Sequence, residues 1–297
     1  MRIVVGVDGS DGSAAALQWA VDEAHARGCP VVALLAYGFY GRPQKVQERT
    51  DGWDEKALGQ AATDVLHETV SAVTGGPRGG AADPVTTMVA ELEPVEALLE
   101  VATGDDDVLV VGSRGLGAVK RLLLGSVGSA CARHASGPVV VVRPPVALDQ
   151  VRPVVVGVDG SPGSLAALDW AIAHAAARRL PLHVVRAWST PPDVSVRMAD
   201  ILAAAGRREE TEKELHELVE RRTRGLDGRV TTELVDGYPA PTLLEAASGA
   251  ELLVLGFRGS GGFAALLLGS VSATCTDHAS TSVALIHPTT EPGGAAA

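Results

Sequence analysis

Two glycine-rich stretches of the sequence share a spacing that suits binding of a phosphate group. The first runs Gly112, two residues, Gly115, nine residues, Gly125 and Ser126. Glycine has no Cβ atom, so backbone N–H groups can approach an anion closely. The stretch is not a P-loop, because the nearby Lys120 follows a valine, and the same lysine breaks a dinucleotide fingerprint. The spacing therefore predicts a phosphate loop of another type, with a plain structural turn as the alternative.

The same spacing recurs in the second half of the chain, with different residues between the glycines. There it comprises Gly256, Gly259, Gly269 and Ser270. The opening of the chain is repeated as well: VVGVDGSDGSAAALQWA begins at Val4 and VVGVDGSPGSLAALDWA begins at Val155. A repeat of roughly 140–150 residues is a whole domain rather than a solenoid unit. The sequence therefore predicts two tandem domains, at 1–144 and 154–288, with a linker at 145–153 and a disordered tail at 289–297.

Within each copy, apolar segments rich in β-branched residues alternate with helical segments. The strands expected in the first copy cover residues 2–8, 31–37, 84–90, 108–112 and 138–143. The helices expected there cover residues 13–26, 54–73, 95–102 and 122–134, and Asp11 or Ser13 is the expected N-cap of the first. No element is expected in the polar segment 38–52. This alternation predicts an α/β fold, in which helices cover both faces of a parallel sheet.

An aspartate follows the first strand of each copy, in Asp8-Gly-Ser and Asp159-Gly-Ser. Ligands of open parallel sheets bind beyond the carboxyl ends of the strands, where the strand order reverses. If the first and fourth strands are neighbours, these aspartates and the glycine loops lie at one site. The alternative is that Asp8 only forms an Asx turn that caps the next helix. Arg114 and Arg258, inside the two loops, are interpreted either as phosphate contacts or as solvated surface residues.

Composition excludes several other classes of function. The net charge is −11, whereas a nucleic-acid-binding protein should have a basic face. There is no run of 18 apolar residues, and the first residues do not resemble a signal peptide, so we expect a cytoplasmic protein that does not enter membranes. The three cysteines are odd in number and lack metal-ligand spacing, which favours small buried residues in a reducing compartment.

Both copies resemble domains of the universal stress protein family, in the branch with the signature Gly-x2-Gly-x9-Gly-Ser/Thr. The resemblance covers residues 3–142 and 154–286, and it includes the Val-Gly-Val-Asp-Gly-Ser opening as well as the glycine loop of each copy. The tandem arrangement is similar to that of actinobacterial members. The resemblance implies two Rossmann-like domains of the adenine nucleotide alpha hydrolase type, each a five-stranded parallel sheet of order 3-2-1-4-5. It also implies ATP, with Mg²⁺, between the first and fourth strands.

The resemblance further implies which residues meet the nucleotide. Asp8 and Asp159 would contact the adenosine, and Ala36 and Ala187, at the ends of the second strands, would offer backbone contacts to adenine. The ribose and phosphates would be held by Gly112, Gly115, Gly125, Ser126, Gly256, Gly259, Gly269, Ser270 and Ser272. The copies differ in places: Leu92-Glu93-Pro94 stands where the second copy has Gly237-Tyr-Pro239, and Gly128 stands where it has Ser272.

Three classes of function remain open on the sequence. A nucleotide-binding regulator of a stress or dormancy response is favoured, because no catalytic residue set and no defined metal ligand is placed at the strand ends. The alternatives are a slow ATPase or another ATP-using enzyme, and a scaffold that has lost its ligand. We also expect the two domains to pair through their last strands, further pairing into homodimers, and an unidentified regulatory protein partner.

Overall fold

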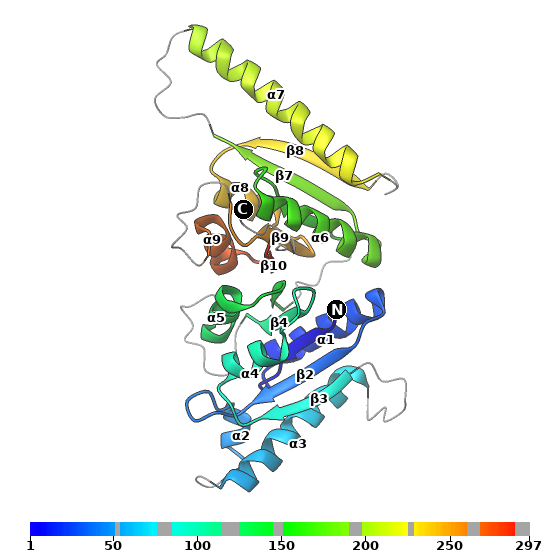
Figure 1. Cartoon of the computed structure of the whole chain (residues 1–297), viewed down its shortest axis with the longest axis vertical. Coiled ribbons are helices and arrows are strands. Elements are labelled where there is room, and N and C mark those ends of the chain that lie inside the picture. The colour runs from blue at the N-terminus through cyan, green and yellow to red at the C-terminus, as the bar shows by residue number, and fades with distance from the viewer. Residues whose placement is uncertain are drawn as a thin grey trace, which may run out of the picture. The chain divides into compact units, whose positions relative to one another are not determined.

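The computed structural model describes residues 1–50, 54–75, 85–113, 125–144, 151–189, 198–224, 229–259 and 268–288, with backbone alone for 198–204. The chain divides into two compact units near residue 146, apart from residues 282–285, which group with the first unit. Figure 1 traces the first half in blue to green and the second in green to red.

The first copy alternates strands and helices, as the sequence predicts. Its elements are β1 (Ile3–Gly6), α1 (Asp11–Arg27), β2 (Val31–Ala36), α2 (Gln44–Gln47), α3 (Glu55–Thr74), β3 (Val85–Ala90), α4 (Pro94–Val101), β4 (Val108–Gly112), α5 (Ser126–His134) and β5 (Val139–Val142).

The second copy repeats this order apart from the short helix α2, which has no counterpart among its described residues. Its elements are β6 (Val154–Gly157), α6 (Pro162–Arg178), β7 (Leu182–Trp188), α7 (Met198–Arg222), β8 (Val230–Asp236), α8 (Pro239–Ala246), β9 (Leu252–Gly256), α9 (Ser270–His278) and β10 (Ser282–Ile286).

The strands of each copy lie in the order third, second, first, fourth, fifth: β3-β2-β1-β4-β5 and β8-β7-β6-β9-β10. In the first copy all four neighbouring pairs are parallel. The order in which strands are added to the sheet reverses after the third strand. The first and fourth strands therefore lie side by side, with Val5 opposite Val110 and Val156 opposite Val254. This is the neighbourhood that the sequence argument for a shared site required.

Helices cover the sheet in two groups. In the first copy α1 packs against α3, and α4 packs against α5. Right-handed crossovers on either side of the order reversal place these two pairs on opposite faces. The central strand β1 is therefore buried on both faces, and Ile3, Val4 and Val5 have no exposed surface. Burial on both faces explains why the strand has a continuous apolar run rather than an alternating pattern.

Three local expectations need correction. The N-cap of α1 is Ser10, not Asp11 or Ser13, because the Ser10 hydroxyl accepts the N–H of Ser13 at 3.1 Å. The last helix of the first copy begins at Ser126, although a start at residue 122 was expected, and residues 122–124 lie outside the described part. The segment 38–52, in which no element was expected, contains α2.

Candidate functional site

The aspartate after the first strand forms a tight turn in both copies. Oδ1 of Asp8 accepts the backbone N–H of Ser10 at 2.9 Å and its hydroxyl at 2.5 Å. In the second copy, Oδ1 of Asp159 accepts the N–H of Ser161 at 2.9 Å. Ser10 and Ser161 in turn cap α1 and α6. One carboxylate oxygen of each aspartate therefore has the Asx-turn role that the sequence left open.

The strand register brings the aspartate level with the end of the second strand. Gly6 lies opposite Leu34, so Asp8, two residues further on, is level with Ala36. Gly157 lies opposite Val185 in the same way, which places Asp159 level with Ala187. The two residues that the resemblance assigns to adenosine thus share one edge of the sheet in each copy.

The fourth-strand loop of the second copy lies directly beside the aspartate turn. A Cβ atom added to Gly259 would be 2.7 Å from Oδ2 of Asp159. Any side chain at Gly259 would press on that carboxylate, because real Cβ atoms do not approach other atoms so closely. The first-strand turn and the fourth-strand loop therefore face one site there. Its counterpart Gly115 lies outside the described residues.

The first glycine of each pattern has a packing role. A Cβ at Gly112 would lie 2.7 Å from the backbone oxygen of Gly12, and one at Gly256 would lie 2.6 Å from the carbonyl carbon of Gly163. Gly12 and Gly163 belong to the first turns of α1 and α6. The absence of a side chain at these strand ends lets the helix approach the strand, whether or not a phosphate is also bound nearby.

The last glycine and serine of each pattern begin a helix at the same edge. Gly125 is the N-cap of α5 and Gly269 that of α9, and among the described residues no side chain caps either helix. Each glycine is held by a bond from its own N–H to the carbonyl that follows the fourth strand, Ser113 or Phe257, at 3.0 Å. Ser126 and Ser270 are exposed in the first turns. A helix N-terminus presents N–H donors and the positive end of the helix dipole, which favours an anion.

Ser272 is placed differently from the other predicted ligands. Its hydroxyl donates to the carbonyl oxygen of Gly256 at 2.7 Å, and the residue is 5% exposed. This bond joins α9 to the end of β9. The predicted contact of this hydroxyl with phosphate would require that bond to be given up. The first copy has Gly128 at the equivalent position and so lacks the hydroxyl.

An aromatic stack that sequence reasoning missed adjoins the second loop. Phe257 lies against the imidazole of His287, with ring centroids 4.0 Å apart, and the Arg258 guanidinium lies 6.0 Å from the Phe257 ring centre. Burial lowers the pKa of His287, and the charge of Arg258 lowers it further. A Cβ at Gly269 would lie 3.4 Å from Cα of Arg258. The backbone of Arg258 therefore packs against the start of α9, while its guanidinium lies over the Phe257 ring.

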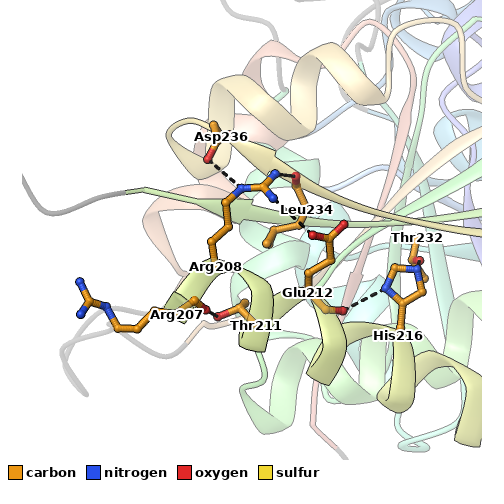
Figure 2. Close-up of polar contacts among 8 residues, drawn as sticks. All are labelled: Arg207, Arg208, Thr211, Glu212, His216, Thr232, Leu234 and Asp236. Atoms are coloured by element: carbon orange, nitrogen blue, oxygen red, sulfur yellow. Dashed lines mark hydrogen bonds and ion pairs between the residues drawn. The ribbon is translucent and has the colours of Figure 1, made fainter. Parts of the chain in front are cut away.

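The end of the edge strand β8 in the second copy is held by side chains of α7. In the second copy, the Arg208 guanidinium of α7 donates to the carbonyl of Leu234 at 3.1 Å and lies 3.5 Å from the Asp236 carboxylate (Figure 2). Glu212, one turn along α7, pairs with the same guanidinium at 3.3 Å. These contacts hold the end of β8 immediately before Gly237, the residue that the first copy replaces by Leu92.

Comparison with known proteins finds the same family twice, once in each half of the chain. The universal stress protein family model matches residues 1–143 and again residues 150–287. The chain belongs to the universal stress protein family. A universal stress protein of Mycobacterium tuberculosis is 34% identical over 290 residues, covering 92% of this chain and 90% of the relative. One from Mycolicibacterium smegmatis is 33% identical over 297 residues, covering 96% and 97%. These actinobacterial relatives have the same tandem length.

The solved structures of universal stress proteins agree with the fold. The crystal structure of one from Archaeoglobus fulgidus superposes with a TM-score of 0.64 at 17% identity, covering 97% of this chain and 96% of that one. Within the described ranges, no helix has the length and apolar character needed to cross a membrane. In the same ranges, no three His, Cys, Asp or Glu side chains gather as a metal site requires.

Proposed function

We propose that each universal stress protein domain binds an adenine nucleotide, ATP with Mg²⁺, and that the chain is a nucleotide-dependent regulator with little or no hydrolysis. The observation that carries the proposal is the approach of Gly259 to Asp159 at the edge where α9 begins. A carboxylate that can accept from a ribose or a base stands at one end of this site. Uncapped helix N–H groups at the start of α9, which suit phosphates, stand at the other.

Slow or absent hydrolysis follows from the chemistry of these residues. The carboxylate that lies nearest the loop, Asp159, already accepts an N–H in its turn, and the other polar groups that we assign to the nucleotide within the described residues are serine hydroxyls and backbone amides. None of these is a strong base that would activate a water molecule. Steady-state phosphate release near about 10 per second, an ordinary enzyme rate, would favour the ATPase alternative.

Calorimetric titration with ATP, and native mass spectrometry of the purified chain, test the proposal. A double variant, Gly115→Glu with Gly259→Glu, should lose binding because it places a second carboxylate beside each phosphate position. Gly206→Glu is the matched control. It adds one glutamate on α7, where an added Cβ meets no atom of the described residues within 4 Å. Two empty sites in the parent protein would favour the scaffold alternative, and binding by the folded double variant would contradict the assigned site.

The expected homodimer and the regulatory protein partner stay predictions. Sedimentation velocity with and without ATP measures the first. A nucleotide-dependent regulator must bind its protein partner with a different affinity when ATP is bound. We therefore expect ATP to increase the affinity of the chain for a second protein.

A further inference from the structure

The segment between β2 and α3 of the first copy is fastened across the sheet edge, and we call residues Gly38–Arg49 the strap. Its first attachment is Glu93, at the start of α4. Oε1 of Glu93 accepts the backbone N–H of Tyr40 at 2.9 Å. The fit is close enough to require glycine twice. A Cβ at Gly38 would lie 2.6 Å from Oε1 of Glu93, and one at Gly41 would lie 2.3 Å from Cδ of Pro94.

The second attachment of the strap is on the other side of the site, on α3. Both terminal nitrogens of Arg49 donate to the Glu68 carboxylate, at 3.0 and 2.7 Å. This hydrogen bond, together with the Arg49 charge, lowers the pKa of Glu68. Both side chains are exposed, so the pair holds the position of the strap more than it adds to overall stability. An exposed ion pair of this kind can break and re-form, so it can hold the strap reversibly.

Between its two attachments the strap rests on the Asp8 turn. A Cβ at Gly9 would lie 2.9 Å from Cδ of Lys45 and 2.9 Å from Cγ1 of Val65 on α3. Val46, the next residue of the strap, has no exposed surface. The aliphatic part of Lys45 therefore covers Gly9, which is buried even though it lies at a strand end.

The path of the strap crosses the position assigned to adenosine. The strap follows β2, whose last residue is Ala36, and it reaches Gly9 beyond the end of β1. The strap thus begins shortly after Ala36 and covers the residue that follows Asp8, and these are the two residues level with each other at that edge. Figure 1 shows the connection leaving β2 and reaching α2 beside α3.

The second copy lacks the attachment at Glu93. Tyr238 stands at that position and is 76% exposed. Asp159 and Gly160 are exposed, whereas Asp8 is half-buried and Gly9 buried. Among the described residues, an added Cβ at Gly160 meets no atom within 4 Å. The residues that follow β7, 190–197, lie outside the described part.

We propose that the strap closes the nucleoside end of the first site, so that a nucleotide enters this site only when the strap is released from Glu93 and Arg49. The inference rests on the proposed function and adds a difference between the two sites: the first exchanges nucleotide slowly and the second rapidly. In this scheme Glu93 and Arg49 are positioning residues that act through the strap and do not touch the nucleotide. A protein with one slow and one fast site retains bound ATP after the free concentration falls.

Association of a fluorescent ATP analogue, followed by stopped flow in a Gly259→Glu background, isolates the first site. Glu93→Ala should raise the association rate by about ten- to a hundredfold, the size expected when a hydrogen bond to a charged acceptor is lost. Glu93→Gln is the matched control, because its amide oxygen still accepts the Tyr40 N–H. Arg49→Glu should act in the same direction with a smaller effect, and adding Glu68→Arg should restore the slow rate by reversing the pair.

Hydrogen exchange without nucleotide provides a readout that does not depend on binding. The Tyr40 amide should exchange faster in Glu93→Ala than in Glu93→Gln. Faster exchange at Tyr40 with an unchanged association rate would overturn the strap proposal while leaving nucleotide binding intact. Equal exchange in the two variants would also overturn it. Failure of the parent protein, with both sites intact, to bind any adenine nucleotide would overturn the proposed function and the strap's role together.

Discussion

The hydroxyl of Ser272 donates to the carbonyl oxygen of Gly256 at 2.7 Å and joins α9 to the end of β9. Ser272→Ala should therefore destabilise the second unit by about 1–2 kcal/mol, because a buried carbonyl loses its partner. Differential scanning calorimetry measures this loss, and ATP titration of the same variant separates the two roles of the residue. Unchanged affinity with lowered stability means a structural hydroxyl, whereas a loss of affinity at unchanged stability means a phosphate ligand.

The glycines of the loop should differ in what their substitution costs. Gly112→Ala and Gly256→Ala place a Cβ within 2.7 Å of helix backbone. Backbone cannot swing aside, so the helix must shift, at a cost of about 1–3 kcal/mol. Gly125→Ser is the control, because among the described residues its Cβ meets only the Ser113 oxygen, at 3.6 Å, and serine is a favourable N-cap. Chemical denaturation measures the three variants. Equal stability of all three variants would contradict the packing role of Gly112 and Gly256.

His287 should make the stability of the second unit depend on pH. Burial, followed by the charge of Arg258, lowers its pKa below the ordinary 6.5. The unfolded chain therefore takes up a proton first as the pH falls. This contribution to stability is complete above about pH 6.5 and is lost as the pH falls toward the lower pKa of the folded state. Replacing His287 by Phe should flatten the Tm between pH 7.5 and 5, and a slope identical to that of the parent would refute the assignment.

The three cysteines should react with alkylating agents in a fixed order. Burial raises the pKa of Cys131 to about 12 and that of Cys275 to about 12. Cys29 is only half-buried, and its raised pKa is partly offset by the charge of Arg27. Because the thiolate is the reactive form, iodoacetamide at pH 8 should label Cys29 first, and the other two only in urea. Peptide mapping checks the order, and rapid labelling of Cys275 in the native protein would contradict it.

Much of the fold could be predicted from the sequence because the relevant signals are local. The apolar runs at residues 31–37 and 108–112 gave β2 and β4 to within a residue, since strands buried on both faces need continuous apolar sequence. The start of α5 was missed because an apolar run before Gly125 resembles a helical segment. Helix α2 was missed because four residues in a polar stretch give no periodic signal.

The candidate site was predicted in outline from two repeated patterns. Duplication of the Asp-Gly-Ser opening and of the glycine spacing predicts which residues form the site, and the rule for parallel sheets predicts the edge at which they lie; their contact with a nucleotide stays a prediction. The spacing alone does not predict which neighbour each glycine packs against. Gly256 and Gly259 belong to one pattern, yet the first packs on the backbone of Gly163 and the second on the carboxylate of Asp159.

The sequence by itself determined the two-domain α/β architecture and the order of its strands and helices, because periodicity and turn chemistry act over a few residues and the repeat can be read by direct comparison of the two halves. Only the tertiary structure decided that Glu93 holds the strap and that Phe257 stacks on His287. Those partners are brought together by strand order and register, and Glu93 and Tyr40 are 53 residues apart in the chain. The strand register that joins them is set by the packing of the whole sheet, so no local pattern in the sequence records the pairing.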